Sequence, residues 1–401
     1  MNTKFKKIIL LIVIFCVFIL LFDLFYYVFF IKKDNKFSFD SINSFSQLDS
    51  CYIAVGSNNI NQNYERAKIS KYDDKYDIMW QHLYEKGYNS AFFGVASDNN
   101  NIIAVGNYEA TKKEHNDLVR SALIVKYDKN GNILADKRFQ ILGNSKFTNV
   151  LVVDDGYIVV GQSIYENMTL GFSDDGGAFI VKYDKELNEV WKHNYGGSKS
   201  AIYNDLIIVN DYIYTVGKDS SRLGIVSKYT LDGKYISTVG YELTDTLGFT
   251  GVTSDNVNLY VVGSKKIDNN QNDLDTDALI VKYDFDLNKL MENTYKNKGI
   301  GRYNKVIIDK NLDILTIGYI SLYNEKMSID ESIKFLYDGI LVKYNVNLQE
   351  VFIKKYVDES DNYFTDLKQI GNKYLISGYS SDNDDYISKF TKYTENGKLI
   401  K

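Results

Sequence analysis

The stretch that decides the fold consists of two apolar segments, Tyr-Ile-Val-Val-Gly at 157–161 and Gly-Ala-Phe-Ile-Val-Lys-Tyr at 177–183. Both are rich in β-branched and aromatic residues, and both have the length of a β-strand. Successive side chains of a strand point to opposite faces, and in the second segment apolar residues occupy both faces. A sheet built from such strands has to be covered on both sides.

The two segments belong to a unit that recurs seven times. Each unit starts with an aromatic residue followed three positions later by Val or Leu, which predicts a strand A: Phe45/Leu48, Phe92/Val95, Phe147/Val150, Tyr203/Leu206, Phe249/Val252, Tyr303/Val306 and Phe364/Leu367. A strand B ends in a glycine: Gly56, Gly106, Gly161, Gly217, Gly263, Gly318 and Gly378. A strand C ends in Lys-Tyr, with Tyr72, Tyr127, Tyr183, Tyr229, Tyr283, Tyr344 and Tyr393. A strand D follows after a short turn, as in Glu189–Trp191.

Four-stranded units that stack face to face around an axis cover both faces of every sheet. The sequence therefore predicts an all-β fold, a seven-bladed β-propeller of four-stranded antiparallel blades, over residues 44–401. Asn, Asp and Gly in the A–B and C–D connections suit tight turns. The spacing within strand A would place the aromatic and the Val or Leu on opposite faces of a regular strand, so we expect the aromatic in the preceding turn. The last strand D is short, at 398–401.

The N-terminus is apolar from residue 8 to 31 and is interrupted only by Asp23. About 20 apolar residues span a bilayer as a helix, and the run ends in large aromatics rather than the small residues of a cleavage site. We predict a cytoplasmic tail at 1–7, an uncleaved transmembrane signal anchor at 8–31, and the propeller on the extracytoplasmic side of the cell membrane. Residues 32–43 form a linker or a ring-closing strand, since 36–40 alternate apolar and polar residues.

The composition and the motifs of the sequence disfavour several classes of function. The formal net charge is −5 and the chain carries no basic run, which is unfavourable for nucleic-acid binding. The two cysteines, Cys16 and Cys51, fall in different predicted compartments, so no intrachain disulfide is expected. The sequence contains no nucleophile elbow, phosphate loop or dinucleotide fingerprint, and we predict no cofactor, no metal and no catalytic residue.

The units resemble the bacterial β-propeller repeats known as SBBP repeats. The similarity is clearest at 177–184, 191–197 and 277–284, and it extends over residues 44–401. The resemblance implies a propeller in a surface or secreted bacterial protein, without implying an activity. Units four and seven depart from the pattern at the Asp after Lys-Tyr, where they have Thr230 and Thr394.

Only the B–C and D–A connections are long and variable, and in a propeller these lie on one face. Loops on a rigid scaffold commonly carry function. Aspartates gather there, and the candidate ligand-binding residues are Asp174, Asp175, Asp273 and Asp275. Alternating carboxylates resemble a hard-cation site, but the segment lacks the glycine and distal glutamate of an EF-hand, so solvated turn residues are the favoured interpretation.

The sequence thus predicts a membrane-anchored binding or scaffold module for a protein, peptide or glycan. One alternative is a propeller enzyme of the hydrolase, lyase or quinoprotein type, although a quinoprotein would carry a tryptophan in nearly every blade and this chain has two. Another is an envelope-assembly factor. His82 and His193 share one position on strand D, and His115 lies in a loop, so we expect structural or solvated histidines. The lysines of Lys-Tyr are expected to keep strand ends soluble.

Overall fold

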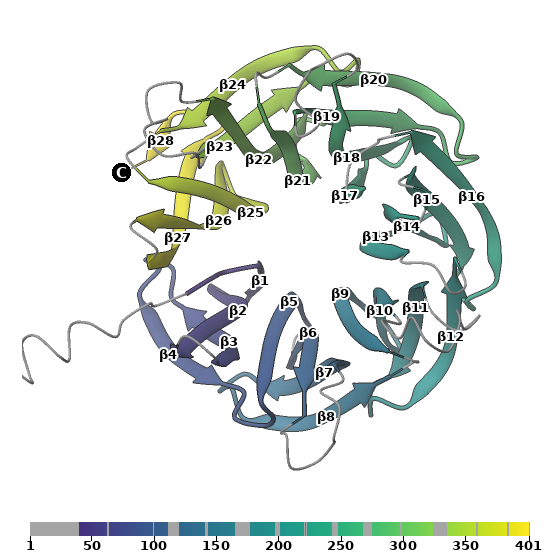
Figure 1. The fold of residues 1–401 in the computed structure, drawn as a ribbon, viewed down its shortest axis with the longest axis vertical. Coiled ribbons are helices and arrows are strands. Elements are labelled where there is room, and N and C mark those ends of the chain that lie inside the picture. Colours follow the sequence, from purple (N-terminus) through teal and green to yellow (C-terminus); the bar gives the residue numbers. More distant parts are fainter. Residues whose placement is uncertain are drawn as a thin grey trace, which may run out of the picture.

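The computed structural model describes residues 40–400 apart from 62–63, 99, 111–119, 141–142, 165–176, 197–200, 220, 222, 243–247, 268–274, 297–298, 324–334, 358–359 and 383–384. Within these residues, seven antiparallel sheets each contain four strands that are consecutive in the sequence. The sheets form a ring in which the first strand of every sheet lies next to the axis and the fourth lies outermost (Figure 1). The predicted seven-bladed β-propeller is confirmed.

The strands of blades 1 to 4 are β1 (Ser44–Leu48), β2 (Cys51–Asn61), β3 (Tyr64–Tyr72), β4 (Ile78–Leu83), β5 (Asn89–Ser97), β6 (Asn101–Glu109), β7 (Arg120–Asp128), β8 (Ile133–Phe139), β9 (Asn144–Val153), β10 (Gly156–Ile164), β11 (Gly177–Asp184), β12 (Glu189–Tyr195), β13 (Ile202–Val209), β14 (Tyr212–Lys218), β15 (Leu223–Thr230) and β16 (Tyr235–Glu242). Those of blades 5 to 7 are β17 (Phe249–Ser254), β18 (Leu259–Lys266), β19 (Thr276–Tyr283), β20 (Lys289–Tyr295), β21 (Gly301–Ile308), β22 (Ile314–Tyr323), β23 (Phe335–Tyr344), β24 (Glu350–Tyr356), β25 (Asp361–Ile370), β26 (Lys373–Asp382), β27 (Asp385–Thr394) and β28 (Leu399–Ile400).

The core is divided among the interfaces between neighbouring blades. Phe179 packs in a buried cluster with Phe147 and blade 2, whereas Ile180, the next residue along the strand, packs in the cluster shared with blade 4. Equivalent clusters lie between the other neighbours, including blades 7 and 1. Both faces of the blades are therefore covered by other blades, which is the physical reason for the closed ring.

The expectation for strand A is wrong in one respect. The aromatic lies in the strand, and a β-bulge follows it: Phe92 pairs with Gly106 and Gly94 with Val105, so the residue between them has no partner. The same irregularity occurs in five further blades. One extra residue rotates the strand by half a period, and this brings the aromatic and the Val or Leu three positions later to the same side.

The bulge also corrects the assignment of the first unit. Phe45 pairs with Ala54, two residues before Gly56, which is the position that the Val or Leu occupies in the other blades. A Cβ on Gly56 would lie against the Ser41 carbonyl, just as Gly106 lies against the carbonyl before Phe92. The pair in the first unit is therefore Ile42/Phe45 rather than Phe45/Leu48.

A belt of hydrogen bonds links the blades next to the axis. In six blades the residue after the aromatic of strand A, or after Ile42 in blade 1, is Asn or Thr. Its side chain donates to the main-chain oxygen of that aromatic, or of Ile42, in the next blade, at 2.6–2.7 Å. The pairs are Asn43 to Phe92, Thr148 to Tyr203, Asn204 to Phe249, Thr250 to Tyr303, Asn304 to Phe364 and Thr365 to Ile42. The last pair closes the ring. Blade 2 has Phe93 at this position, which has no donor.

Asp40 contacts both blades at the ring closure. Its main-chain N–H donates to the Tyr386 oxygen on β27, and it forms an isolated bridge with Asn58 on β2. Its carboxylate accepts from Ser388 of blade 7 and pairs with the buried Lys68 of blade 1. The rest of the segment 36–40 lies outside the described residues, so a ring-closing strand stays a prediction.

The repeated polar residues of the turns also have defined contacts. After Lys-Tyr, the Asp128 carboxylate accepts from the main-chain nitrogens of residues 130 and 132, and Thr230 and Thr394 each accept one such bond through the hydroxyl. The lysines do more than keep strand ends soluble, because several donate to the C–D turn of the next blade, as Lys126 does to the Lys185 oxygen at 2.8 Å. Both residue types therefore fix the turns in place.

The part of the chain that the structure describes contains no helix long and apolar enough to cross a membrane. The tail predicted at 1–7 and the membrane helix predicted at 8–31 lie outside that part.

Candidate functional site

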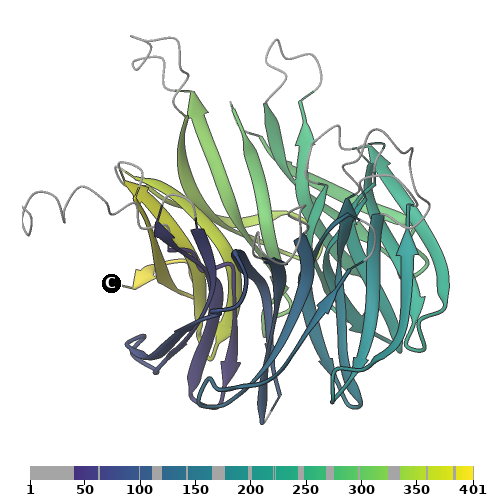
Figure 2. The same cartoon turned by 60° about the horizontal axis from the view of Figure 1, so that its bottom comes forward.

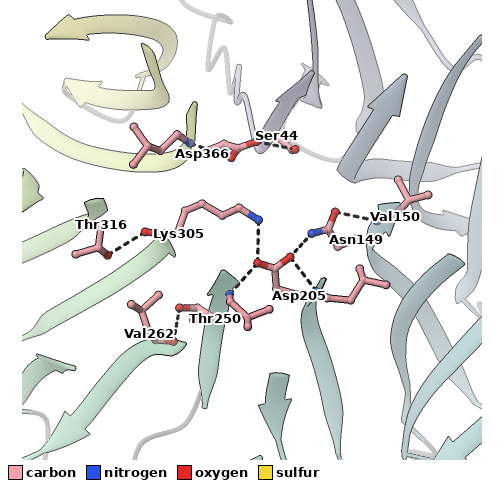
Figure 3. A network of polar contacts seen from close by, with 12 residues as sticks. Ser44, Asn149, Val150, Asp205, Thr250, Val262, Lys305, Thr316 and Asp366 are labelled. Carbon is pink, nitrogen blue, oxygen red and sulfur yellow. Dashed lines mark hydrogen bonds and ion pairs between the residues drawn. The ribbon is translucent and has the colours of Figure 1, made fainter. Parts of the chain in front are cut away.

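A polar cluster occupies the axial end of several inner strands. Its members lie two positions beyond the aromatic of strand A, or beyond Ile42 in blade 1: Ser44, Asn149, Asp205, Lys305 and Asp366. Blades 2 and 5 have Gly94 and Gly251 at this position. The Asp205 carboxylate accepts from the side chain of Asn149 and from Lys305 Nζ, at 2.8 Å for the lysine (Figure 3). It also accepts the main-chain N–H groups of the next residue and of Val252 in blade 5. These contacts connect blades 3, 4, 5 and 6.

Asp366 makes the corresponding contacts between blades 7 and 1. Its carboxylate accepts from the Ser44 hydroxyl at 2.9 Å, from the Phe45 N–H at 3.0 Å and from the N–H of the next residue at 2.8 Å (Figure 3). Burying a polar group costs little when protein donors satisfy its hydrogen bonds. The axial acids therefore serve to hold the inner strands together.

Lys305 remains a cation in this cluster. Burial by itself would lower the pKa of the Lys305 ammonium, but the carboxylates of Asp205 and Asp366 outweigh that effect and raise the pKa. An amine acts as a nucleophile or base only when it is deprotonated. The geometry is thus that of an internal ion cluster and is unsuited to amine chemistry at neutral pH.

A separate polar cleft of about 380 Å³ is formed by residues of three blades. It is lined by Ser41, Asn43, Ser57, Asn59, Tyr64, Glu65, Asn89, Ser90, Ala91, Phe93, Asn107, Arg120 and Tyr379, from blades 1, 2 and 7. These residues lie at the ends of strands B and at the starts of strands A and C. The strands run between the two faces of the ring (Figure 2), so the cleft lies on the face of the B–C and D–A connections.

Hydrogen bonds to the main chain fix the amides of the cleft. Asn107 Oδ1 accepts the Ala91 N–H at 3.0 Å, and Asn89 Oδ1 accepts the Glu65 N–H at 3.0 Å. Asn43 donates through Nδ2 to the belt described above. Each amide has both donor and acceptor atoms. The bonds to the main chain use the acceptor of Asn107 and the donor of Asn43, whereas Asn89 also donates through Nδ2 to the Glu109 carboxylate at 3.2 Å. The cleft is therefore a rigid surface that can still donate and accept.

Five tyrosines continue from the cleft across blades 6 and 7, and we call them the tyrosine patch: Tyr319, Tyr337, Tyr363, Tyr379 and Tyr386. The ring centroids of neighbouring members are 5.0–5.8 Å apart. All five side chains are half-buried. Tyr379 belongs to both the cleft and the patch, so the two form one continuous surface.

The candidate aspartates do not form a site in the described residues. Asp174, Asp175 and Asp273 lie outside those residues. Asp275 is described, but only 6% of it is exposed and it does not line the cleft. In the described part of the chain, no group of three or more His, Cys, Asp or Glu residues has an arrangement that could hold a metal ion. The predicted ligand role of the four aspartates stays a prediction.

The histidine placement agrees with the sequence where the structure covers it, since His82 lies on β4 and His193 on β12, both outermost strands. The sequence did not lead us to predict the axial cluster or the cleft. A signal for the cluster was present, because the two residues between the aromatic and the Val or Leu are mostly polar. No signal within one unit identifies the cleft, whose lining comes from three blades.

Comparison with known proteins supports the fold. No family model and no curated protein sequence matches the chain. The WD40 domain of Neurospora crassa Pan2 has a TM-score of 0.52 at 8% identity, over 86% of this chain and 88% of that one. Puromycin hydrolase has a TM-score of 0.50 at 9% identity, over 90% of this chain and 53% of that one. The β-propeller domain of the Trilobed protease from Pyrococcus furiosus has a TM-score of 0.46 at 10% identity, over 91% of this chain and 98% of that one. That domain is described as having an open velcro topology.

At these identities the similarity shows the fold alone. Together with the seven sheets and the clusters between them, it establishes that the chain is, from residue 40 onward, a seven-bladed β-propeller.

Proposed function

We propose that the chain is a membrane-anchored binding module, and that its ligand occupies the polar cleft and the tyrosine patch on the face of the B–C and D–A connections. The observation that carries the proposal is this continuous surface, formed by half-buried tyrosines and rigidly held amides. Concave sites with a few convergent polar groups are typical ligand sites. The acids of the axial cluster are occupied by protein donors, which favours binding at the cleft over chemistry at the axis.

The binding role is tested by titrating the purified chain with two probe sets, neutral hexasaccharides and unstructured twelve-residue peptides, using calorimetry. We expect saturable binding of at least one probe, weakened about tenfold or more in the double variant Asn59→Ala/Arg120→Ala, since each removed contact contributes about 1 kcal/mol. Both positions line the cleft, and more than half of the Arg120 side chain is exposed, so the fold should be retained.

The matched control is Glu242→Ala/Lys266→Ala, in a second hollow of about 450 Å³ at the outer edge of blades 4 and 5. This variant should bind like the parent chain. Absence of binding to both probe sets, or equal loss in the control variant, would contradict the proposed function.

The anchoring and orientation are proposed from the apolar run at 8–31 and the lysines before it. Cys51, which begins β2 and is partly exposed, allows a direct test. In a Cys16→Ser background, we expect a membrane-impermeant maleimide to label Cys51 in intact cells, because the propeller is proposed to be extracytoplasmic. Cells expressing Cys16→Ser/Cys51→Ser give the background signal. Labelling that requires permeabilised cells would show the opposite orientation.

A further inference from the structure

We propose that the ligand class of the cleft and tyrosine patch is a neutral oligosaccharide chain. This inference rests on the proposed function and adds the chemistry of the ligand. The sequence left three ligand classes open, namely glycan, peptide and protein, and this inference selects the glycan. Three features of the surface carry it: its charge balance, its donor and acceptor groups, and the row of rings that leads out of it.

The first feature is the charge of the lining. Only two of the residues that line the cleft are charged, Glu65 and Arg120, and their charges are opposite. Arg120 Nε also lies 3.4 Å from the carboxylate of Glu109, so the charge of the arginine is already offset. An anionic ligand would leave water and meet only this offset cation, which is an unfavourable exchange. The cleft therefore favours an uncharged ligand over an anionic one.

The second feature is the density of amide and hydroxyl groups. Asn43, Asn59, Asn89 and Asn107 line the cleft. The three serines of the lining, Ser41, Ser57 and Ser90, are buried, and their hydroxyls form hydrogen bonds within the protein. A sugar hydroxyl both donates and accepts a hydrogen bond, and an amide or a hydroxyl can meet either need. A peptide anchored at a hot spot requires a well-packed apolar or aromatic pocket. The lining has one aliphatic side chain, Ala91, and its three aromatic rings, Tyr64, Phe93 and Tyr379, lie among amides, so the cleft favours a ligand rich in hydroxyls over an apolar anchor.

The third feature is the tyrosine patch. Sugar rings have apolar C–H faces as well as hydroxyls at the edge, and tyrosine combines an apolar ring with one polar group. Tyr363 and Tyr379 are stacked with centroids 5.0 Å apart and an interplanar angle of 26°. Burial raises the pKa of Tyr379 to about 12, so its hydroxyl is neutral at physiological pH. The patch thus extends the same uncharged surface beyond the cleft.

The geometry also sets the length of the ligand. The cleft has the volume of a small-ligand site, whereas the five rings extend over strands of two blades, β22, β23, β25, β26 and β27. A ligand that contacts both is longer than one or two sugar units. We therefore expect affinity to rise with chain length until the patch is covered.

The experiment uses the full chain and compares four classes of probe. The first class is neutral hexasaccharides, built from glucose, galactose, mannose or N-acetylglucosamine. The others are the matching disaccharides, a hexasaccharide of uronic acids, and the twelve-residue peptides. We expect at least one neutral hexasaccharide to bind, about tenfold or more tighter than its disaccharide and than the uronic acid chain. Tyr379→Ala should weaken binding about tenfold, whereas Tyr379→Phe, which keeps the ring, should stay within about threefold.

Each outcome has a defined consequence. Binding of a neutral hexasaccharide with the expected effect of both Tyr379 variants supports the inference. Binding of peptides alone, lost in Asn59→Ala/Arg120→Ala, would overturn the sugar assignment while leaving the proposed binding function intact. Tighter binding of the uronic acid chain would likewise overturn it. Circular dichroism and the unfolding midpoint of Tyr379→Ala establish whether that variant is folded, and Arg120→Ala provides a second cleft variant if it is not.

Discussion

The Gly217→Ala variant is expected to lose about 3 kcal/mol of unfolding free energy, at the upper end of the cost of overpacking. Gly217 is the second-last residue of β14, the second strand of blade 4, and pairs with Tyr203 at the bulge. A Cβ at this position would lie 1.8 Å from the main-chain oxygen of Ile202 and 2.9 Å from Cα of Tyr203. Both obstacles are backbone atoms of a paired strand, so the conflict cannot be relieved by a side-chain rotation.

Urea unfolding followed by circular dichroism measures this loss, and poor recovery of folded protein would be consistent with it. The matched control is Gly240→Ala in the outermost strand of the same blade. There the nearest atom to an added Cβ is Cδ1 of Leu223, at 3.0 Å, which is the end of a flexible side chain. We expect a change within about 1 kcal/mol for the control. Equal stability of the two variants would show that the contact at Gly217 is not as rigid as the bulge implies.

The second large effect is expected for Lys343→Met, with a loss of about 3–5 kcal/mol. Lys343 Nζ lies 2.9 Å from the carboxylates of both Asp309 and Asp313. Asp309 also accepts from the Tyr374 hydroxyl of blade 7, at 2.8 Å, and its side chain has no exposed surface. Removal of the lysine leaves a buried carboxylate without its cation, which costs more than the ion pair itself contributes.

Two controls separate this effect from the loss of a surface lysine. Lys282 occupies the same repeat position in blade 5 and donates to the Val346 oxygen at 3.0 Å, so Lys282→Met should cost about 1 kcal/mol or less. In Lys343→Met/Asp309→Asn the remaining side chain is neutral. Its Oδ1 can still accept the N–H groups of Asn311 and Asp313, and its Nδ2 can donate to the Tyr374 hydroxyl. This double variant should recover most of the stability, and a double variant no more stable than Lys343→Met would contradict the explanation.

The ion pair between Lys343 and Asp309 also predicts that the stability of the fold depends on pH. Burial by itself would raise the pKa of Asp309, but hydrogen bonds from Lys343 and Tyr374 outweigh it and lower the pKa from 3.8. A carboxyl whose folded pKa is lowered contributes stability above its unfolded pKa and loses it as pH falls through the folded value. The stability difference between the parent chain and Lys343→Met should therefore be full near pH 7 and shrink below about pH 4, as measured by urea unfolding across that range.

The sequence predicted the strands and their number well because that information is local. The glycine of strand B and the Lys-Tyr of strand C recur within each unit, and alternate residues such as Phe179 and Ile180 show that both faces are apolar. The error in strand A has a physical cause. A bulge changes the face on which a side chain lies without changing the composition, so the pattern could not distinguish it from a turn.

By itself, the sequence determined that seven four-stranded units with two apolar faces must stack into a ring, because each strand carries its own periodicity and needs only its neighbours to satisfy it. Only the tertiary structure decided which polar residues meet. Lys305 and Asp205 are 100 residues apart, and Ser44 and Asp366 are 322 apart. The cleft likewise combines Asn107 of blade 2 with Tyr379 of blade 7. Contacts of this kind depend on the closed ring, which places blade 7 beside blade 1, and a repeat contains no record of which copy becomes its neighbour.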